Sequence, residues 1–566
     1  MLKYSIFFYP GLKEIVSKEG KVQFRNAEEC WRVIQGELKR ELLVHIERFA
    51  RENSSPTRVV FGTSGWRGEI GTDFTFRNVG IVSEAILNIL KRDDEPLRKA
   101  LGFRDFDELK KRGVIIGHDN RFLGPEFAKT VMGVLAREGI RLYFAGETTT
   151  PEISASIEML HAGCSINITP SHNPSNYSGL KFNPADGGPA GPEITEEIEK
   201  EANHLMETTE EVHFQESTPA YEQIDTTELY REFLLRQGVV SLERVEEFLE
   251  REDCLVVVDH VHGATRGRPE RLIRTAADLT GKKLLLLRTE DDYLFGGVAP
   301  EPSEKNMQNV VRLLRESNAK FRLGVIMDPD GDRIRFADQR MQIPMNYFGA
   351  MALHFLHKYK GVNGVVVKSV GTSNFVNAIA AKEGIPVRET KVGFKNFRPY
   401  LLPDAREKAI VAFEESDGIT AGNHTLEKDA LFGLLLAIEM VATTGKNLSD
   451  YLTELMDRYG YYYPDRSGVE VDRSLAGETL RMKISSLADE YSVGSIINVG
   501  GRSLKIVDQI TVDGVKFVLE DGSWFMIRPS GTEPKVRFYI EARDPEEKRA
   551  LFSVAETLTK EAVKSG

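Results

Sequence analysis

The chain has 566 residues, of which 41% are hydrophobic and 28% charged, and its formal net charge is −12. At roughly 150 residues per domain this length predicts three or four domains, and the acidic balance argues against a nucleic-acid or membrane surface. The three cysteines form no CxxC pair, which excludes a zinc ribbon or thioredoxin-type site. The longest apolar run, residues 430–438, is too short to cross a membrane. We therefore expect a cytoplasmic protein with neither partner.

Residues 1–55 are interpreted as an N-terminal extension. Within it, residues 27–52 have the apolar spacing of one amphipathic helix. We expect this helix to pack against the first domain.

One order of elements, strand–helix–strand–helix–strand, then occurs three times. Continuous Val, Ile and Leu runs that alternate with helices are typical of mostly parallel sheets covered on both faces. We therefore expect three topologically similar α/β domains. The predicted strands are 113–119, 141–146 and 165–169, then 254–260, 283–287 and 323–327, then 364–370, 386–390 and 409–413. The predicted helices lie near 125–138, 152–162, 269–280, 304–318, 373–383 and 396–407.

After about residue 460 the pattern changes to alternating strands and a closing helix near 545–564, which predicts a smaller C-terminal α+β domain. An acidic helix and linker near 195–225 separate the first two domains. The loop after each third strand is polar, and ligands bind outside the carboxyl ends of such strands. We expect four domains around a central cleft: domain I at 56–215, domain II at 226–339, domain III at 344–455 and domain IV at 465–566.

The loop DPDGDR follows a buried strand and places Asp328, Asp330 and Asp332 at alternate positions. In an extended loop these side chains fall on one side, and Mg²⁺ prefers such oxygen ligands. An EF-hand is excluded, because Arg333 and Gln339 occupy its glycine and glutamate positions. An acidic surface turn is the alternative.

The loop TPSHNP holds Ser171 between two prolines, which stiffen the turn. One interpretation is a hydrolase nucleophile, but a GxSxG elbow is missing and His172 is poorly placed as a triad base. The other is a phosphoryl carrier, because a phosphoserine would add oxygen ligands to a cation held by the Asp loop. A simple turn is the third alternative.

Other loops offer groups for anions and sugars. The loop RPSGTEPKVRF is rich in hydrogen-bond donors and predicts a phosphate clamp, with a decorated hairpin as the alternative. In FEESDG, Glu414 and Ser416 suit sugar hydroxyls, although a surface turn explains the segment equally well. The glycine-rich segments KVGFKNF and FGTSGWRG add Lys395 and Arg67 as candidate anion contacts.

Together these motifs resemble the α-D-phosphohexomutases, the phosphoglucomutase/phosphomannomutase superfamily. FGTSGWRG, TPSHNP, DPDGDR, VGFKNF, EESDG and RPSGTEP occur in family order, and the resemblance covers residues 56–566. It implies three similar α/β domains and a smaller fourth domain around a deep cleft. Domains I to IV would then carry the phosphoserine, metal-binding, sugar-recognition and phosphate-binding loops respectively.

The resemblance also implies roles for individual residues. Ser171 would be the phosphoserine, and its phosphate would hold Mg²⁺ together with Asp328, Asp330 and Asp332. Arg67, His172 and Lys181 would assist phosphoryl and proton transfer. The substrate would be a small phosphosugar, with a hexose 1,6-bisphosphate as intermediate and activator. The implied substrate-binding residues are Arg333, Gly393, Lys395, Glu414, Ser416, Lys428, Arg528, Ser530, Gly531, Thr532 and Arg537.

The sequence also departs from the family pattern. Pro170 replaces the alanine that often precedes the serine, and Asp417 follows Ser416 where the dual mannose/glucose branch has glycine and histidine. The EES form resembles that of the glucose-preferring branch, and this resemblance implies glucose 1-phosphate and glucose 6-phosphate as the favoured substrates. The alternatives are a phosphomannomutase or dual enzyme, then a phosphopentomutase or phosphoglucosamine mutase, and last a non-catalytic phosphosugar-binding protein. The sequence makes no prediction of oligomeric state.

Overall fold

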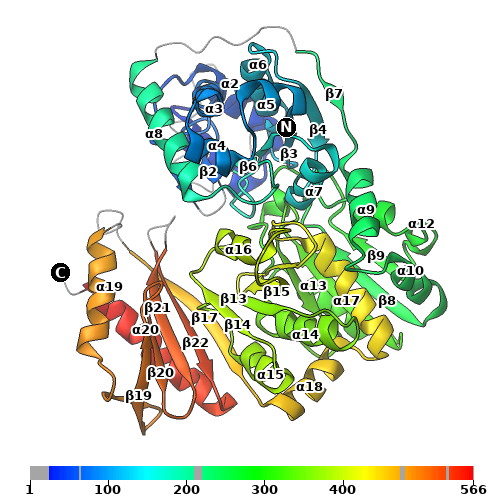
Figure 1. Ribbon diagram of the computed structural model, residues 1–566, viewed down its shortest axis with the longest axis vertical. Coiled ribbons are helices and arrows are strands. Elements are labelled where there is room, and N and C mark those ends of the chain that lie inside the picture. The colour runs from blue at the N-terminus through cyan, green and yellow to red at the C-terminus, as the bar shows by residue number, and fades with distance from the viewer. Residues whose placement is uncertain (1–23, 63–64, 210–218, 472–477, 531–534, 565–566) are drawn as a thin grey trace, which may run out of the picture.

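The computed structural model describes residues 24–62, 65–209, 219–471, 478–530 and 535–564. Four sheets follow one another along the chain. Figure 1 shows the first at the top, the second and third in the centre and the fourth at the lower left.

The first three sheets share a four-strand unit: three parallel strands, with the first in the middle, and a fourth strand antiparallel to the third. The predicted fold class is confirmed, and the antiparallel fourth strand, which we did not predict, makes each sheet mixed. The units are β3 (Val114–His118), β4 (Leu142–Glu147), β5 (Cys164–Ile168) and β6 (Tyr177–Pro184); β8 (Cys254–Asp259), β9 (Leu284–Leu287), β10 (Phe321–Met327) and β11 (Ile334–Ala337); and β13 (Val365–Ser369), β14 (Val387–Thr390), β15 (Ala409–Glu414) and β16 (Gly418–Ala421).

Short strands extend the first two sheets. In the first, β1 (Phe61–Gly62) and β2 (Gly65–Glu69) continue from β6, and β7 (Glu222–Gln223) lies beside β4. In the second, β12 (Gln342–Ile343) lies beside β11.

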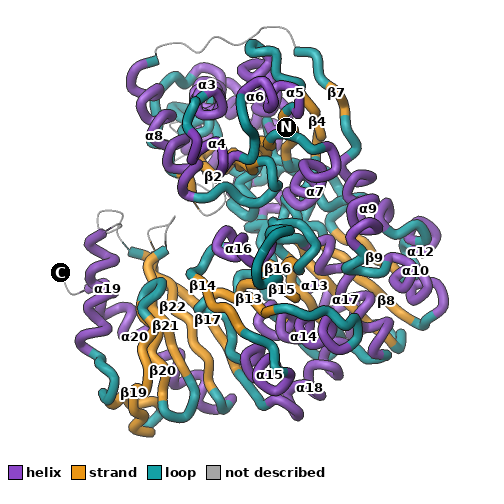
Figure 2. The backbone as a smooth tube through the Cα atoms, viewed as in Figure 1, coloured by secondary structure: helices purple, strands orange, loops and turns teal. Residues whose placement is uncertain are grey.

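Helices cover both faces of the first three sheets (Figure 2). Along β3, Val114 and Ile116 pack into one buried cluster and Ile115 into another, so the strand is apolar on both sides. The helices are α3 (Phe76–Lys91), α4 (Glu95–Leu101), α5 (Phe106–Arg112), α6 (Gly124–Ala136), α7 (Thr150–Leu160) and α8 (Pro192–Thr208); α9 (Thr226–Gln237), α10 (Leu242–Arg251), α11 (Arg268–Leu272), α12 (Ala276–Leu279), η3 (Phe295–Gly297) and α13 (Gln308–Glu316); and α14 (Met345–Lys358), α15 (Phe375–Glu383), η4 (Phe394–Phe397), α16 (Arg398–Leu401), α17 (Ala430–Thr444) and α18 (Leu448–Tyr459).

Two predicted helices differ from the structure. The helix expected near 269–280 is divided into α11 and α12, because Ile273 has extended backbone angles. The helix expected near 396–407 ends at Leu401, two residues before Pro403, since the residue before a proline disfavours helical angles.

The N-terminal helix is also divided, into α1 (Ala27–Glu37), η2 (Arg40–Leu42) and α2 (Leu43–Glu52). Leu38 ends α1 in the left-handed conformation, with a φ of 52°. The buried side chains of α1 and α2 belong to the core of the first sheet. The Trp31 Nε1 also donates a hydrogen bond to the Ile70 carbonyl at 2.9 Å. The predicted packing onto the first domain is thus confirmed.

The extension also contacts other segments. Gln35 Nε2 donates to Asn176 Oδ1 at 2.9 Å, beyond Ser171 in the same loop. Arg40 forms an ion pair of 2.8 Å with Asp292, which precedes η3. The extension therefore bridges the first and second sheets.

The fourth sheet is antiparallel, as predicted. Glu541 joins it to the third domain by accepting hydrogen bonds from the Ser373 hydroxyl and from the Asn374 backbone N–H, the latter at 3.0 Å. The sheet contains β17 (Tyr463–Glu470), β18 (Ile496–Val499), β19 (Arg502–Ile510), β20 (Val515–Leu519), β21 (Trp524–Pro529) and β22 (Lys535–Ala542), with α19 (Glu478–Glu490) and α20 (Pro545–Lys564) packed against it.

Among the described residues, no single helix is long and apolar enough to cross a membrane. Helices α17 and α18 meet these criteria only as a pair, across a bend of 73°.

Candidate active site

Three turns carry the predicted serine, the three aspartates and Ser416, and each turn occupies the same position in its repeat, between the third parallel strand and the antiparallel strand. They are residues 169–176, 328–333 and 415–417. Direct contacts join them, because Ser171 Oγ donates to Asp328 Oδ2 at 2.8 Å and the Ile334 backbone donates to the Asp417 carbonyl at 2.9 Å. The repeated topology therefore brings three different loops to one place.

Ser171 is 1% exposed and has a left-handed backbone with a φ of 59°. Its backbone N–H donates to Thr169 Oγ1 at 3.0 Å, and its Oγ lies 3.3 Å from His172 Nδ1. Burial, followed by the charges of Arg333 and Arg67, lowers the pKa of His172 well below its usual value. The serine hydroxyl thus lies between the neutral imidazole of His172 and the carboxyl group of Asp328.

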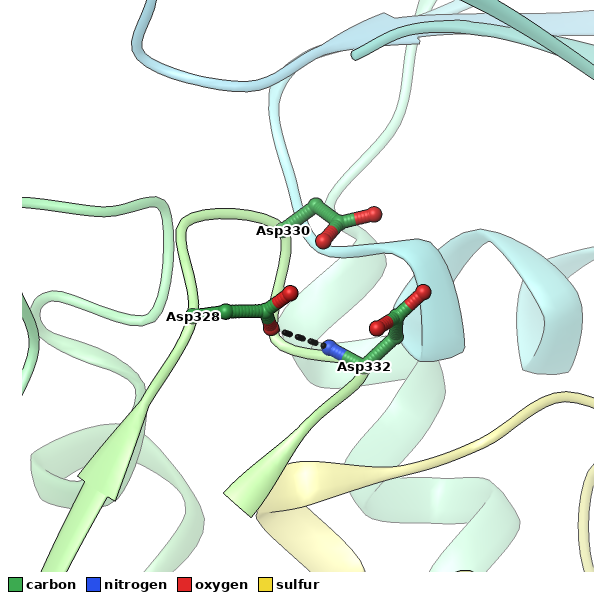
Figure 3. A group of neighbouring side chains, drawn as sticks. All are labelled: Asp328, Asp330 and Asp332. Atoms are coloured by element: carbon green, nitrogen blue, oxygen red, sulfur yellow. Dashed lines mark hydrogen bonds between the residues drawn. The ribbon is translucent and has the colours of Figure 1, made fainter. Parts of the chain in front are cut away.

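The three predicted aspartates face one another around their turn (Figure 3). One carboxylate oxygen from each lies within 4.8 Å of the others, and the Asp332 backbone N–H donates to Asp328 Oδ1 at 3.0 Å. Gly331, with a φ of 67°, makes the turn tight, and a side chain there would collide with Thr149 and Thr265.

The oxygens Asp330 Oδ1 and Asp332 Oδ1 are buried and accept no hydrogen bond from any described residue. Buried carboxylate oxygens need a partner, and hard divalent cations take oxygen ligands of this kind. The donor set therefore fits Mg²⁺.

Cationic side chains surround the aspartates. Lys181 Nζ lies 2.6 Å from Asp330 Oδ2 and 2.9 Å from Asp332 Oδ2, and Lys428 Nζ lies 3.0 Å from the latter. Arg333 Nε is 3.7 Å from Asp332 Oδ1. Burial alone would raise the pKa of Asp332, but these three positive charges hold it well below its usual value. The three positive charges of Lys181, Lys428 and Arg333 thus equal in number the three negative charges that the aspartates carry when ionised.

Asp328 behaves differently from its neighbour. Burial, followed by the charges of Asp330 and Asp332, raises the pKa of Asp328 well above its usual value. A cation among the three carboxylates would oppose that shift.

A polar cavity of about 380 Å³ opens beside these turns. Its volume is within the range of small-molecule sites. The structure brings most predicted residues to its wall, but Lys395 is not among the described residues that line it, and Ser171, Lys181 and the aspartates lie buried behind the wall. Gly531 and Thr532 lie outside the described residues. The predicted residues on the wall are Arg67, His172, Arg333, Gly393, Glu414, Ser416, Lys428, Arg528, Ser530 and Arg537.

Glu414 and Ser416 form one side of this cavity. Glu414 Oε1 accepts from the Gly393 backbone at 2.6 Å, and Ser416 Oγ donates to Glu414 Oε2 at 3.4 Å. Burial, followed by the charge of Glu415, raises the pKa of Glu414 to about 7. The two segments that we predicted to recognise the sugar are therefore in direct contact.

Basic residues of the fourth domain form another side. Arg528 lies 3.2 Å from Asp513 Oδ2 and 3.5 Å from the Tyr539 hydroxyl. Burial lowers the pKa of Arg67, in the first domain, to about 10, and its Nη1 donates to Asn173 Oδ1 at 2.8 Å. These arginines supply the donors that a phosphate group requires.

Our sequence analysis missed several residues at this site. Asp417 binds Arg335 of β11 at 2.8 Å and lies 3.6 Å from Arg466 of β17, so it links the second, third and fourth domains. Other residues outside our predicted set also line the cavity, among them Glu301, Glu427 and Lys535. Asp417 and Lys535 belong to segments that we recognised, EESDG and RPSGTEPKVRF, whereas no local pattern marks Glu301.

Four family models match consecutive parts of the chain. Phosphoglucomutase/phosphomannomutase α/β/α domains I, II and III match residues 58–209, 237–341 and 344–459, and the C-terminal domain of that family matches residues 481–555. Together these matches cover most of the chain.

Two curated relatives align with this chain over nearly the whole of their own length. A phosphoglucomutase/phosphomannomutase from Thermococcus kodakarensis is 27% identical over 89% of this chain and 99% of its own. A phosphoglucosamine/phosphogalactosamine mutase from Sulfurisphaera tokodaii is 27% identical over 86% of this chain and 95% of its own.

A solved structure agrees in fold. A protein from Thermus thermophilus assigned as a phosphomannomutase is 28% identical, with a TM-score of 0.71 over 89% of this chain and 100% of its own. With four domain models in order and relatives matched from end to end, the chain belongs to the phosphoglucomutase/phosphomannomutase family, whose members are mutase isomerases that act as intramolecular phosphotransferases.

Proposed function

We propose that this chain interconverts hexose 1-phosphate and hexose 6-phosphate, that glucose phosphates are its preferred substrates, and that Ser171 carries the phosphoryl group. The observation that supports this most directly is the 2.8 Å hydrogen bond from Ser171 Oγ to Asp328, beside a cavity that also carries Arg528 and Arg537. A nucleophile, an acidic triad and a phosphate clamp at one cavity are the parts that phosphoryl transfer between two ends of a sugar requires.

The charges support a phosphoserine bound together with a cation. The three aspartates already face Lys181, Lys428 and Arg333, so their charges are balanced. A phosphate on Ser171 adds about two negative charges, which a divalent cation would offset. Asp328, Asp330, Asp332 and the phosphoserine would hold Mg²⁺, and the bound ion would neutralise charge on the transferred phosphoryl group.

The reaction then has two transfers. In the first, the bond between phosphorus and Ser171 Oγ breaks as the C6 hydroxyl of a hexose 1-phosphate forms a new bond to phosphorus. Arg67, His172 and Lys181 would stabilise the phosphoryl oxygens and move the hydroxyl proton. The resulting 1,6-bisphosphate turns over within the cavity, and Ser171 takes the phosphoryl group from C1.

Substrate selection would involve the phosphate and the sugar separately. Arg528, Ser530 and Arg537, with Gly531 and Thr532 in the same loop, would bind the phosphate that is not being transferred. Glu414 and Ser416 would accept hydrogen bonds from sugar hydroxyls, beside Gly393. We favour glucose over mannose because the EES form of the loop resembles the glucose-preferring branch of the family. The two sugars differ only in the orientation of one hydroxyl, so a small change in this loop could set the preference.

The test is ³¹P NMR of the protein with Mg²⁺, a trace of glucose 1,6-bisphosphate and equal amounts of glucose 1-phosphate and mannose 1-phosphate. We expect glucose 1-phosphate to be converted well ahead of mannose 1-phosphate. Equal rates would identify a dual enzyme. Conversion of neither would direct the same assay to glucosamine and pentose phosphates. Ser171→Ala should abolish turnover, and near-normal activity would refute the assignment of Ser171.

A further inference from the structure

The backbone of the serine loop requires support. Ser171 has a φ of 59°, a conformation that costs a residue with a side chain of the order of 1 kcal/mol or more. Residues 169–176 belong to neither β5 nor β6, so their carbonyl groups lack the regular pairing of a sheet. Something else must hold the loop if Ser171 Oγ is to stay beside Asp328.

Arg121 provides that support. Its Nη2 donates to the carbonyls of Ser171 at 2.7 Å and Asn173 at 2.6 Å. Its Nη1 donates to the carbonyls of Pro174 at 2.6 Å and Tyr177 at 3.2 Å. One guanidinium group thus binds four carbonyl oxygens of the loop and of the first residue of β6.

Arg121 is itself fixed by its neighbours. It is 1% exposed, and its Nε lies 3.3 Å from Asp119 Oδ2. That same oxygen accepts a hydrogen bond of 2.7 Å from Thr169 Oγ1, which in turn accepts from the Ser171 backbone. Asp119 therefore connects both Arg121 and the start of the loop, so the loop is held at its first residue and along its carbonyls.

The second domain completes the support. The ring of Phe295, in η3, lies under the Arg121 guanidinium at 4.8 Å from the ring centroid. Phe295 is fully buried, and the preceding Leu294 packs in the core of the first sheet. A planar cation stacked on an aromatic face has a fixed orientation, so the two domains together set the direction of the guanidinium.

We propose that Arg121 is a positioning residue for phosphoryl transfer, which holds the Ser171 loop in the conformation that presents Oγ to the metal loop. This inference rests on the proposed function, because it concerns the same serine. Arg121 does not line the cavity, so it acts through the loop and not on the substrate.

The proposal predicts a specific kinetic pattern. Arg121→Lys keeps the charge, but an ammonium group has three donors and no planar fork, so it cannot serve all four carbonyls. We expect kcat to fall 10-fold to 100-fold and KM for glucose 1-phosphate to change less than threefold, since the described cavity residues of the third and fourth domains do not contact Arg121. Arg121→Met, which has no donor, should lose more than Arg121→Lys.

The direct assay is phosphorylation of Ser171 in the full-length chain. Protein is mixed with glucose 1,6-bisphosphate and Mg²⁺, and the phosphorylated fraction is followed with time by intact mass spectrometry. Arg112→Lys is the matched control, because Arg112 also donates to three backbone carbonyls of the first domain, but at the opposite end of β3. We expect slow phosphorylation in Arg121→Lys and a wild-type rate in Arg112→Lys.

Three outcomes overturn the proposal. In the first, Arg121→Lys is phosphorylated as fast as the wild type, which refutes the positioning role of Arg121 but leaves the proposed function intact. In the second, both lysine variants lose rate in proportion to their loss of stability, so that the role is only structural. In the third, the wild type takes up no phosphoryl group, which refutes the proposed function and the inference together.

A second variant covers the case in which Arg121→Lys does not fold. Phe295→Leu keeps every hydrogen bond of Arg121 and removes only the stacked ring. We expect a twofold to tenfold slower phosphorylation with an unchanged KM. An unchanged rate in a folded Phe295→Leu protein would then count against the inference.

Discussion

Replacing Lys181 with methionine tests the charge balance of the site. Lys181 is 3% exposed and contacts two aspartates, at 2.6 and 2.9 Å. Methionine has a similar length and no charge, so three buried carboxylates would face only Lys428 and Arg333. Breaking a buried ion pair on one side costs about 3–5 kcal/mol, and we expect that loss in the free energy of unfolding when Mg²⁺ is absent.

Mg²⁺ should reverse part of this loss. The variant has one more uncompensated negative charge around the oxygens Asp330 Oδ1 and Asp332 Oδ1, which accept no hydrogen bond from a described residue. It should therefore bind Mg²⁺ at least tenfold more tightly than the wild type does, a gain of about 1.4 kcal/mol. Ligand binding to the folded state adds directly to stability.

The assay is urea unfolding followed by circular dichroism, with EDTA and with saturating Mg²⁺. Lys446→Met is the control, because Lys446 pairs with Glu454 on the surface and should change stability by less than about 1 kcal/mol under both conditions. If Mg²⁺ stabilises Lys181→Met no more than it stabilises the wild type, the aspartates do not form the cation site and our reasoning is refuted.

Three further predictions concern the metal loop, the sugar loop and the interface of the third and fourth domains. Asp330→Asn should lower kcat about 10²-fold or more in the ³¹P assay while the far-UV spectrum is unchanged; an unchanged rate would count against the metal site. Asp417→Asn weakens the ion pair with Arg335 and should raise KM for glucose 1-phosphate about tenfold, with a smaller change in kcat, because Asp417 holds the loop that contains Ser416; an unaltered KM would contradict this role. Burial, followed by the charge of Lys368, lowers the pKa of Lys516 to about 7, so between pH 7 and 10.5 the unfolded chain binds more protons and stability rises with pH. Lys516→Met should reduce that rise in thermal unfolding, and an identical pH dependence in variant and wild type would exclude this cause.

The sequence was sufficient for the parallel strands and for the metal loop. Strands such as Cys254–Asp259 are buried on both faces, so a continuous apolar run marks them in the sequence whichever strands pair with them. The spacing of Asp328, Asp330 and Asp332 is local, and it needs only a tight turn to bring the carboxylates together.

The antiparallel strands were missed for a physical reason. β6 carries glycine, lysine and asparagine, because its residues approach the site or the neighbouring backbone, and it therefore lacks the alternation of an ordinary strand. Lys181 was assigned by family resemblance alone, and its position on β6 explains how it reaches two aspartates.

The other features that the sequence did not predict depend on contacts between residues far apart in the chain. Arg121 binds carbonyl groups, which every residue possesses, so its partners have no signature in the sequence. The helical pattern of the sequence continues through Leu38, where the structure has a break, and Leu38 lies against Gly297 of the second domain. Such features depend on the assembled domains, which a local pattern does not describe.

The N-terminal helices have a practical consequence for shortened forms of this protein. The family match begins at residue 58, yet Trp31 and Ile46, which precede it, are buried in the core of the first sheet. A buried tryptophan covers about 200 Å², or about 5 kcal/mol at 25 cal/mol per Å². A polypeptide trimmed to the shared region would expose the apolar surface around Ile70 and Gly71 that these helices cover, and it should aggregate during purification although every predicted site residue is retained.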